Sequence, residues 1–181
     1  MRHGIVDTAA RIALRAHQSQ KRRNDGDPYI IHPFMIAMQL KGFGFDDEVV
    51  AAALLHDVLE DTAVTARELG AEVGAKVVAM VQVLSEDKSL PWEERKELYI
   101  NNVVAATDGV KAIAVADKLY NLTDMLAGLD HEGEEFWQDF TRGSDQQKWF
   151  FRSFVDAIKT SWKHPLVDEL ETLTQEFEVL P

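Results

Sequence analysis

Histidine and carboxylate residues cluster at a few positions of this sequence. Their side chains could together bind a metal ion and catalyse the hydrolysis of a phosphate bond. Imidazole and carboxylate together suit a hard or borderline divalent ion such as Mn²⁺, Fe²⁺, Zn²⁺ or Mg²⁺. Such an ion lowers the pKa of a bound water molecule and polarises a phosphoryl oxygen. We therefore predict a metal-dependent phosphohydrolase whose ligands are His32, His56, Asp57 and Asp117.

The spacing of the central cluster separates it from ordinary surface residues. His56 and Asp57 directly follow the apolar run AAALL, where an ionisable pair needs a partner. Glu60 lies four residues after His56, and Asp61 lies four after Asp57, so on a continuous helix each pair shares a face. Three carboxylates this close repel one another unless a cation neutralises them. We expect Glu60 and Asp61 to orient or deprotonate the attacking water.

Each candidate has a simpler explanation when it is taken singly. A His-Asp pair can mark the point where a helix reaches solvent, Asp117 can pair with Lys118, and His32 can cap a helix or fill a core. The combination favours one metal site. The chain has no cysteine, which excludes thiolate ligands and cysteine nucleophiles and argues against a closed structural zinc site.

The elements that must position these groups are helices. Apolar residues recur at helical spacing along most of the chain, and no apolar run of strand length is bounded by turns. We predict a compact, multi-helix, all-α fold in which residues 1–181 form a single domain, with a motif core at about 5–130 and C-terminal helices at about 145–178. The predicted helices span about residues 4–20, 33–40, 46–61, 65–74, 75–84, 92–107, 109–129, 145–162 and 165–178, with a connector at 85–91 and an acidic linker at 130–135.

Composition and net charge limit the kinds of molecule that we expect this protein to bind. Apolar residues make up 46% of the chain, enough for a core, and the net charge of −12 repels a nucleic-acid backbone. No stretch approaches the roughly 18 uninterrupted apolar residues of a membrane span, and the N-terminus lacks the apolar centre of a signal peptide. We expect a cytoplasmic protein that binds a small molecule and neither nucleic acid nor membrane, and the oligomeric state stays open.

The local sequence around the candidate ligands is similar to a known family. The segments AHQSQKRRNDGDPYIIHP (16–33), AALLHDVLEDT (52–62) and ADKLYNL (116–122) resemble the hydrolase domain of RelA/SpoT-type alarmone enzymes, within the HD superfamily of metal-dependent phosphohydrolases. The likeness is closest to the stand-alone small alarmone hydrolases. Since only about 50 residues follow Asp130, no synthetase domain is expected, and the chain should degrade alarmones without making them.

The resemblance implies a substrate, a cofactor and residue roles. The substrate would be the nucleotide ppGpp or pppGpp, hydrolysed to GDP or GTP and pyrophosphate, with one divalent ion, usually Mn²⁺. By matching motifs, the resemblance assigns metal-ligand roles to His32, His56, Asp57 and Asp117, catalytic roles to Glu60 and Asp61, and nucleotide contacts to Arg22, Lys118 and Asn121.

Basic residues supply further candidate contacts for phosphate in this acidic chain. Lys21, Arg22 and Arg23 form the densest basic run, and Arg95 with Lys96 is a second pair. Arginine can also stack on a purine, whereas the simpler explanation of the run is a solvated loop.

Three alternatives to a guanosine alarmone hydrolase stay open. The same reaction could act on the adenosine alarmones ppApp and pppApp. The chain could be another HD-type enzyme, such as a nucleotidase or a cyclic-nucleotide phosphodiesterase. It could also be a regulatory domain that binds without turnover, although the intact Glu60-Asp61 pair argues against that.

Overall fold

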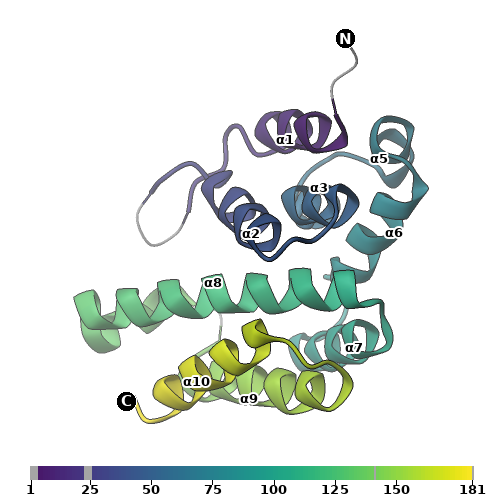
Figure 1. Ribbon diagram of the computed structural model, residues 1–181. Coiled ribbons are helices and arrows are strands. Elements are labelled where there is room, and N and C mark those ends of the chain that lie inside the picture. Colours follow the sequence, from purple (N-terminus) through teal and green to yellow (C-terminus); the bar gives the residue numbers. More distant parts are fainter. Residues whose placement is uncertain (1–3, 23–25, 141, 181) are drawn as a thin grey trace. The chain divides into compact units, whose positions relative to one another are not determined.

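The protein is built from helices (Figure 1). The computed structural model describes residues 4–22, 26–140 and 142–180, and within these ranges the β geometry is limited to an isolated bridge between Lys21 and Pro28. The predicted all-α fold is therefore confirmed. The chain divides into two compact units, Met1–Ala114 and Val115–Pro181. One domain over residues 1–181 stays a prediction.

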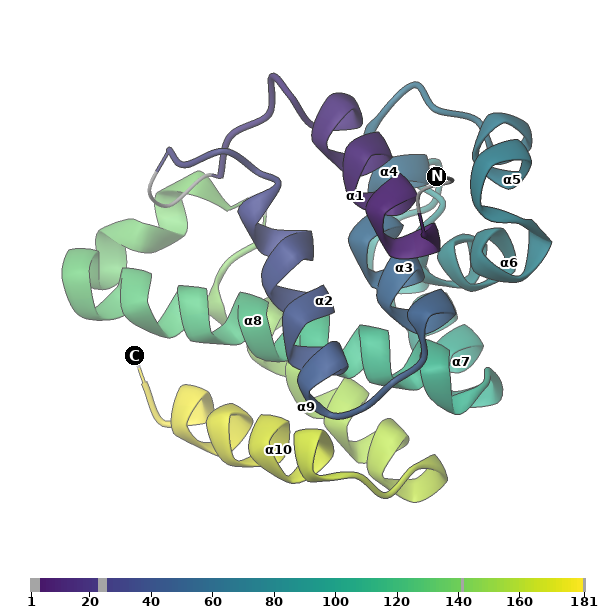
Figure 2. The ribbon, with the colours of Figure 1, turned by 45° about the horizontal axis from the view of Figure 1, so that its top comes forward.

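The first unit is organised around a buried central helix, α3 (Asp47–Leu55). All residues from Val49 to Leu55 are buried, and α1, α2 and α6 pack against them. Figure 2 shows α1 and α2 beside α3. The remaining helices of this unit are α1 (Ile5–Ala16), α2 (Ile31–Gly42), α4 (Val58–Asp61), α5 (Ala66–Val73), α6 (Ala75–Leu84) and α7 (Trp92–Ala105), while α8 (Asp108–Glu132) begins here and continues into the second unit.

Local capping explains where several helices begin. The Asp46 side chain accepts a hydrogen bond from the Val49 N–H at 2.9 Å and caps the first turn of α3. Thr65 and Glu68 form a reciprocal capping box at α5. The helix α2 begins at Ile31, two residues before the predicted start, because Pro33 fits within the first turn, where its missing N–H would have no helical partner.

The second unit consists of the later part of α8, the 3₁₀ helix η1 (Gly133–Asp139), α9 (Ser144–Ser161) and α10 (Pro165–Glu178). Pro165 opens α10 as predicted. The core includes Phe154 and Phe177, both fully buried. The expected linker at 130–135 is wrong, because α8 continues to Glu132 and turns at Gly133, whose φ of 63° is the left-handed conformation typical of a helix end.

Candidate metal centre

The predicted helix through residues 46–61 is interrupted at the His-Asp pair. The helix α3 ends at Leu55 and α4 begins at Val58, so His56 and Asp57 form a turn. The imidazole Nδ1 of His56 lies 2.8 Å from the carbonyl oxygen of Ala53, which in a continuous helix would accept from the Asp57 N–H. The side chain thus competes with the backbone for that carbonyl at the point where the helix is interrupted.

His32, His56 and Asp57 converge in the first unit. Each offers one ligand atom, and these atoms all lie within 4.8 Å of one another. The Asp57 Oδ2 atom is 3.0 Å from His56 Nε2 and 3.7 Å from His32 Nε2. Both histidines are buried, whereas the Asp57 side chain keeps 18% of its surface exposed. The turn between α3 and α4 therefore meets the start of α2 at one cluster of potential ligands.

The donor chemistry of this cluster fits a divalent cation. A carbonyl oxygen only accepts hydrogen bonds, so a neutral His56 carries its proton on Nδ1 and turns the Nε2 lone pair toward Asp57. Two lone-pair atoms 3.0 Å apart repel each other unless a proton or a metal ion stands between them. A ring nitrogen fixed by a backbone carbonyl is also the usual arrangement of metal-binding histidines.

Tyr29 supports Asp57 from the segment before α2. Its hydroxyl donates a hydrogen bond to Asp57 Oδ2, the oxygen near both histidines. Its ring contacts those of His17 and His32, with centroids 4.9 and 5.6 Å apart. Tyr29 was not predicted from the sequence, although it lies only three residues before the candidate ligand His32.

The segment after α1 is also bound to the end of α4. The amide Nε2 of Gln20 donates to the backbone carbonyl of Asp61 at 2.8 Å, while Gln20 Oε1 lies 2.6 Å from Nδ1 of the buried His17. The Tyr29 N–H donates to the Gln20 carbonyl at 3.0 Å. The two ends of this loop are therefore joined to each other and to α4.

The predicted catalytic pair lies on α4, where the connector 85–91 holds both carboxylates. The backbone N–H of Glu86 donates to Glu60 Oε2 at 2.9 Å. The Lys88 ammonium binds Asp61 Oδ1 and lies 3.5 Å from Glu60 Oε1. These contacts place the two carboxylates against a common cation.

Burial raises the pKa of Glu60 above its ordinary value. The hydrogen bond from Glu86 and the charge of Lys88 oppose this rise, while the charges of Glu86 and Asp57 add to it. A carboxylate whose pKa is raised accepts a proton more readily at neutral pH, as a general base must.

The second predicted basic pair, Arg95 and Lys96, binds a buried carboxylate. Arg95 Nε lies 2.8 Å from Glu86 Oε2, and Lys96 Nζ lies 2.6 Å from Glu86 Oε1. Glu86 belongs to the connector that holds Glu60, so its ion pairs with Arg95 and Lys96 stabilise this connector. Their contact with phosphate stays a prediction. Lys88, which was not predicted from the sequence, binds the predicted catalytic pair.

The two ends of the predicted nucleotide-binding loop lie side by side. Lys21 pairs with Pro28 in the isolated bridge, and the Arg22 N–H donates to the Asp27 carbonyl at 2.7 Å. Lys21 is exposed and Arg22 is partly buried, whereas Arg23 lies outside the described residues. The role of this run in binding a nucleotide stays a prediction.

The predicted site residues of the second unit form a cluster on α8. Asp117 is buried, and both its carboxylate oxygens accept hydrogen bonds, from Lys118 Nζ at 2.6 Å and from Asn121 Nδ2 at 2.7 Å. The Lys118 ammonium lies 5.6 Å from the centre of the Phe150 ring. The role of Asp117 as a fourth ligand stays a prediction, as do the nucleotide contacts of Lys118 and Asn121.

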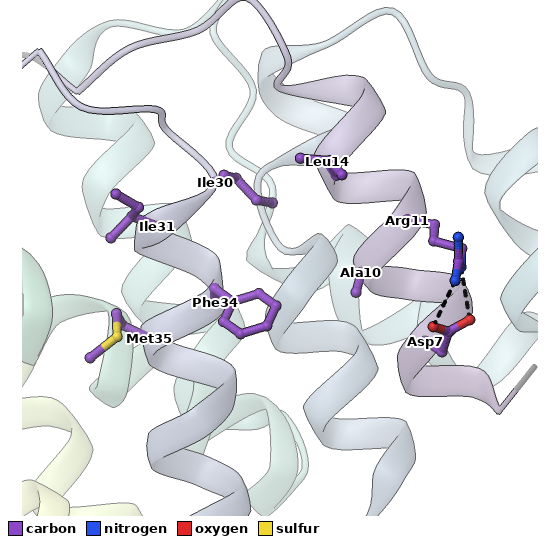
Figure 3. Close-up of a pocket in the computed structure, with 8 residues that line it drawn as sticks. All are labelled: Asp7, Ala10, Arg11, Leu14, Ile30, Ile31, Phe34 and Met35. Carbon is purple, nitrogen blue, oxygen red and sulfur yellow. Dashed lines mark hydrogen bonds and ion pairs between the residues drawn. The ribbon is translucent and has the colours of Figure 1, made fainter.

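A separate hollow of about 510 Å³ lies between α1 and the start of α2 (Figure 3). The ion pair between Asp7 and Arg11, 2.9 Å long, stands at its edge. Its walls are otherwise apolar, and no candidate ligand or catalytic carboxylate lines it. The lining residues are Asp7, Ala10, Arg11, Leu14, Ile30, Ile31, Phe34 and Met35.

Comparison with known proteins identifies the family. Residues 9–141 match the family model of the HD domain, and the chain belongs to this family. It is 43% identical over 120 residues to the human guanosine-3′,5′-bis(diphosphate) 3′-pyrophosphohydrolase MESH1, a match that covers 65% of this chain and 67% of the human one.

Two solved structures extend the similarity to the fold. One is described as a metazoan ortholog of SpoT that hydrolyses ppGpp, and it matches with a TM-score of 0.81 at 26% identity over 99% of each chain. The other, a protein of Listeria monocytogenes, matches with a TM-score of 0.76 at 38% identity over 81% of this chain and 99% of its own. The predicted resemblance to HD-type alarmone hydrolases is confirmed.

Proposed function

We propose that this protein is a hydrolase that removes the 3′-pyrophosphate of ppGpp and pppGpp, releasing pyrophosphate and GDP or GTP. The observation that carries the proposal is the convergence of His32, His56 and Asp57 on one point, directly before a helix that bears Glu60 and Asp61. The similarity to MESH1 supports this choice of substrate within the HD domain family.

His32, His56 and Asp57, with Asp117 as the fourth ligand, would hold a divalent metal ion, Mn²⁺ in our proposal. Bound there, the ion would lower the pKa of a water molecule and polarise a phosphoryl oxygen.

The chain's own carboxylates then act on water and on the proton. Glu60, whose pKa burial raises, accepts a proton from the attacking water, and Asp61 orients that water. The water oxygen bonds to the phosphorus attached to the 3′-oxygen, and the bond from that phosphorus to the 3′-oxygen breaks. The nucleotide keeps the 3′-oxygen, which takes up a proton, and pyrophosphate leaves.

The finer assignments belong to the same proposal. Nucleotide contacts come from Lys21, Arg22, Arg23, Lys118 and Asn121, and from Arg95 and Lys96 while these two stay paired with Glu86. The protein works in the cytoplasm as one catalytic domain without nucleic acid or membrane. Among the described residues, no helix is long and apolar enough to cross a bilayer.

A substrate panel tests the proposal. Purified protein is incubated with Mn²⁺ and ppGpp, pppGpp, ppApp, GMP or cyclic nucleotides, and the products are separated by anion exchange. Pyrophosphate and GDP from ppGpp are the expected products. Turnover of ppApp alone would move the substrate to adenosine alarmones, and phosphate released from GMP would replace the proposal with a nucleotidase.

A further inference from the structure

We propose that Lys88 is the residue that binds the pyrophosphate group of the substrate, an inference that rests on the proposed function. Lys88 belongs to the connector between α6 and α7, 27 residues after Asp61. No sequence motif joins it to the candidate ligands. Its place beside Glu60 and Asp61 is seen only in the folded first unit.

The Lys88 ammonium is held beside the catalytic pair and is open to solvent. It binds Asp61 Oδ1 and lies 3.5 Å from Glu60 Oε1, while 51% of the side chain is exposed. An ammonium group has three N–H donors, so a donor is left for an incoming oxygen after two carboxylates are contacted. The turn that carries it is fixed by Asp87, whose Oδ1 accepts from the Ser89 N–H at 3.0 Å and from the Ser89 hydroxyl at 2.6 Å.

A cation beside these carboxylates offsets their repulsion of the substrate. A pyrophosphate group is a polyanion, and to reach the attacking water it must approach Asp57, Glu60 and Asp61, which repel it. Lys88 stays positively charged there. Burial alone lowers its pKa, but the hydrogen bonds and charges of Asp61 and Glu60 outweigh that effect and leave the pKa above its ordinary value.

Neighbouring basic residues of the first unit are bound to other carboxylates. Arg95 and Lys96 contact Glu86, whose side chain is only 7% exposed, so moving either cation would leave a buried charge without compensation. Lys88 contacts the two carboxylates that act on the substrate. As a flexible point charge, its ammonium can add a phosphate oxygen to these contacts.

The test compares the affinities of the two products, so it does not depend on turnover. Metal-loaded protein is titrated by calorimetry with inorganic pyrophosphate and separately with GDP, each at the same free Mn²⁺ concentration. We expect Lys88→Met to weaken pyrophosphate binding by about 10- to 100-fold, the range for loss of a hydrogen bond to a charged group. GDP affinity should stay within about twofold, because GDP lacks the 3′-pyrophosphate, and Lys88→Arg should restore most of the loss.

The matched control is Lys76→Met, which removes another lysine of the first unit that pairs with a carboxylate, Glu48. It should leave both affinities unchanged. If the Lys88→Met variant binds pyrophosphate with wild-type affinity but has a lower kcat, the inference is overturned. Lys88 would then be a positioning residue only. If the Met variant does not fold, Lys88→Gln replaces it. A wild-type protein that binds pyrophosphate but leaves ppGpp intact would refute the proposed function and not this inference.

Discussion

The hydroxyl group of Tyr29 provides a direct test of how the metal ligand Asp57 is held. It donates a hydrogen bond to Asp57 Oδ2, the oxygen that lies 3.0 Å from His56 Nε2. Tyr29→Phe removes this donor and keeps the ring that packs on His17 and His32. The substitution therefore changes the orientation and charge of one ligand with little change in packing.

The expected magnitude follows from the burial of the pair. A hydrogen bond to a charged group contributes about 1.5–3 kcal/mol, and loss of a partner behind a metal ligand costs about 10- to 100-fold in metal affinity. Because the Asp57 side chain is 18% exposed, water can replace part of the lost bond. We expect the lower end of the range, about a tenfold weaker Mn²⁺ affinity, which equals about 1.4 kcal/mol.

Calorimetric titration of metal-stripped protein with Mn²⁺ measures this change. The control is Tyr99→Phe, which alters a buried tyrosine of α7. It should bind Mn²⁺ like the wild type. A Tyr29→Phe protein that also keeps wild-type affinity would refute the reasoning, because Asp57 would then be oriented without the hydroxyl.

Three further predictions concern the catalytic pair and the packing of the second unit. Asp57→Ala should abolish Mn²⁺ binding, whereas Glu60→Gln should keep the metal and lose about 100-fold or more in kcat; equal metal affinity in both variants would contradict the assigned roles. Because burial raises the pKa of Glu60, its contribution to stability is present below its unfolded pKa and is lost as pH rises through the folded pKa. Glu60→Gln should therefore raise the melting temperature of metal-free protein at pH 8, with the gain shrinking toward pH 4; a gain independent of pH would be inconsistent with this cause. Gly128→Ala places a Cβ 2.2 Å from the Phe136 ring, so overpacking of about 1–3 kcal/mol should exceed the gain of about 1 kcal/mol in helix propensity. Its melting temperature should fall, whereas Gly42→Ala, with no neighbour within 4 Å of the added carbon, should be neutral or stabilising.

The helices were predictable from the sequence because the forces that begin and end them are local. Asp46 caps α3 through the Val49 N–H three residues away, and Pro165 fits the first position of α10, while helical periodicity marks the buried faces. The break at His56 and Asp57 was missed, because periodicity does not reveal that an imidazole takes a backbone carbonyl.

The sequence by itself determined the chemical types present: imidazole and carboxylate side chains in the order of the HD domain, with a Glu-Asp pair that begins three residues after Asp57. The tertiary structure decided which polar and charged side chains contact one another. Tyr29 reaches Asp57 across 28 residues, and Lys88 reaches Asp61 across 27. Spacing predicts contacts only along one helix, where the backbone sets the distance, so pairs from different elements are known only once packing brings those elements together.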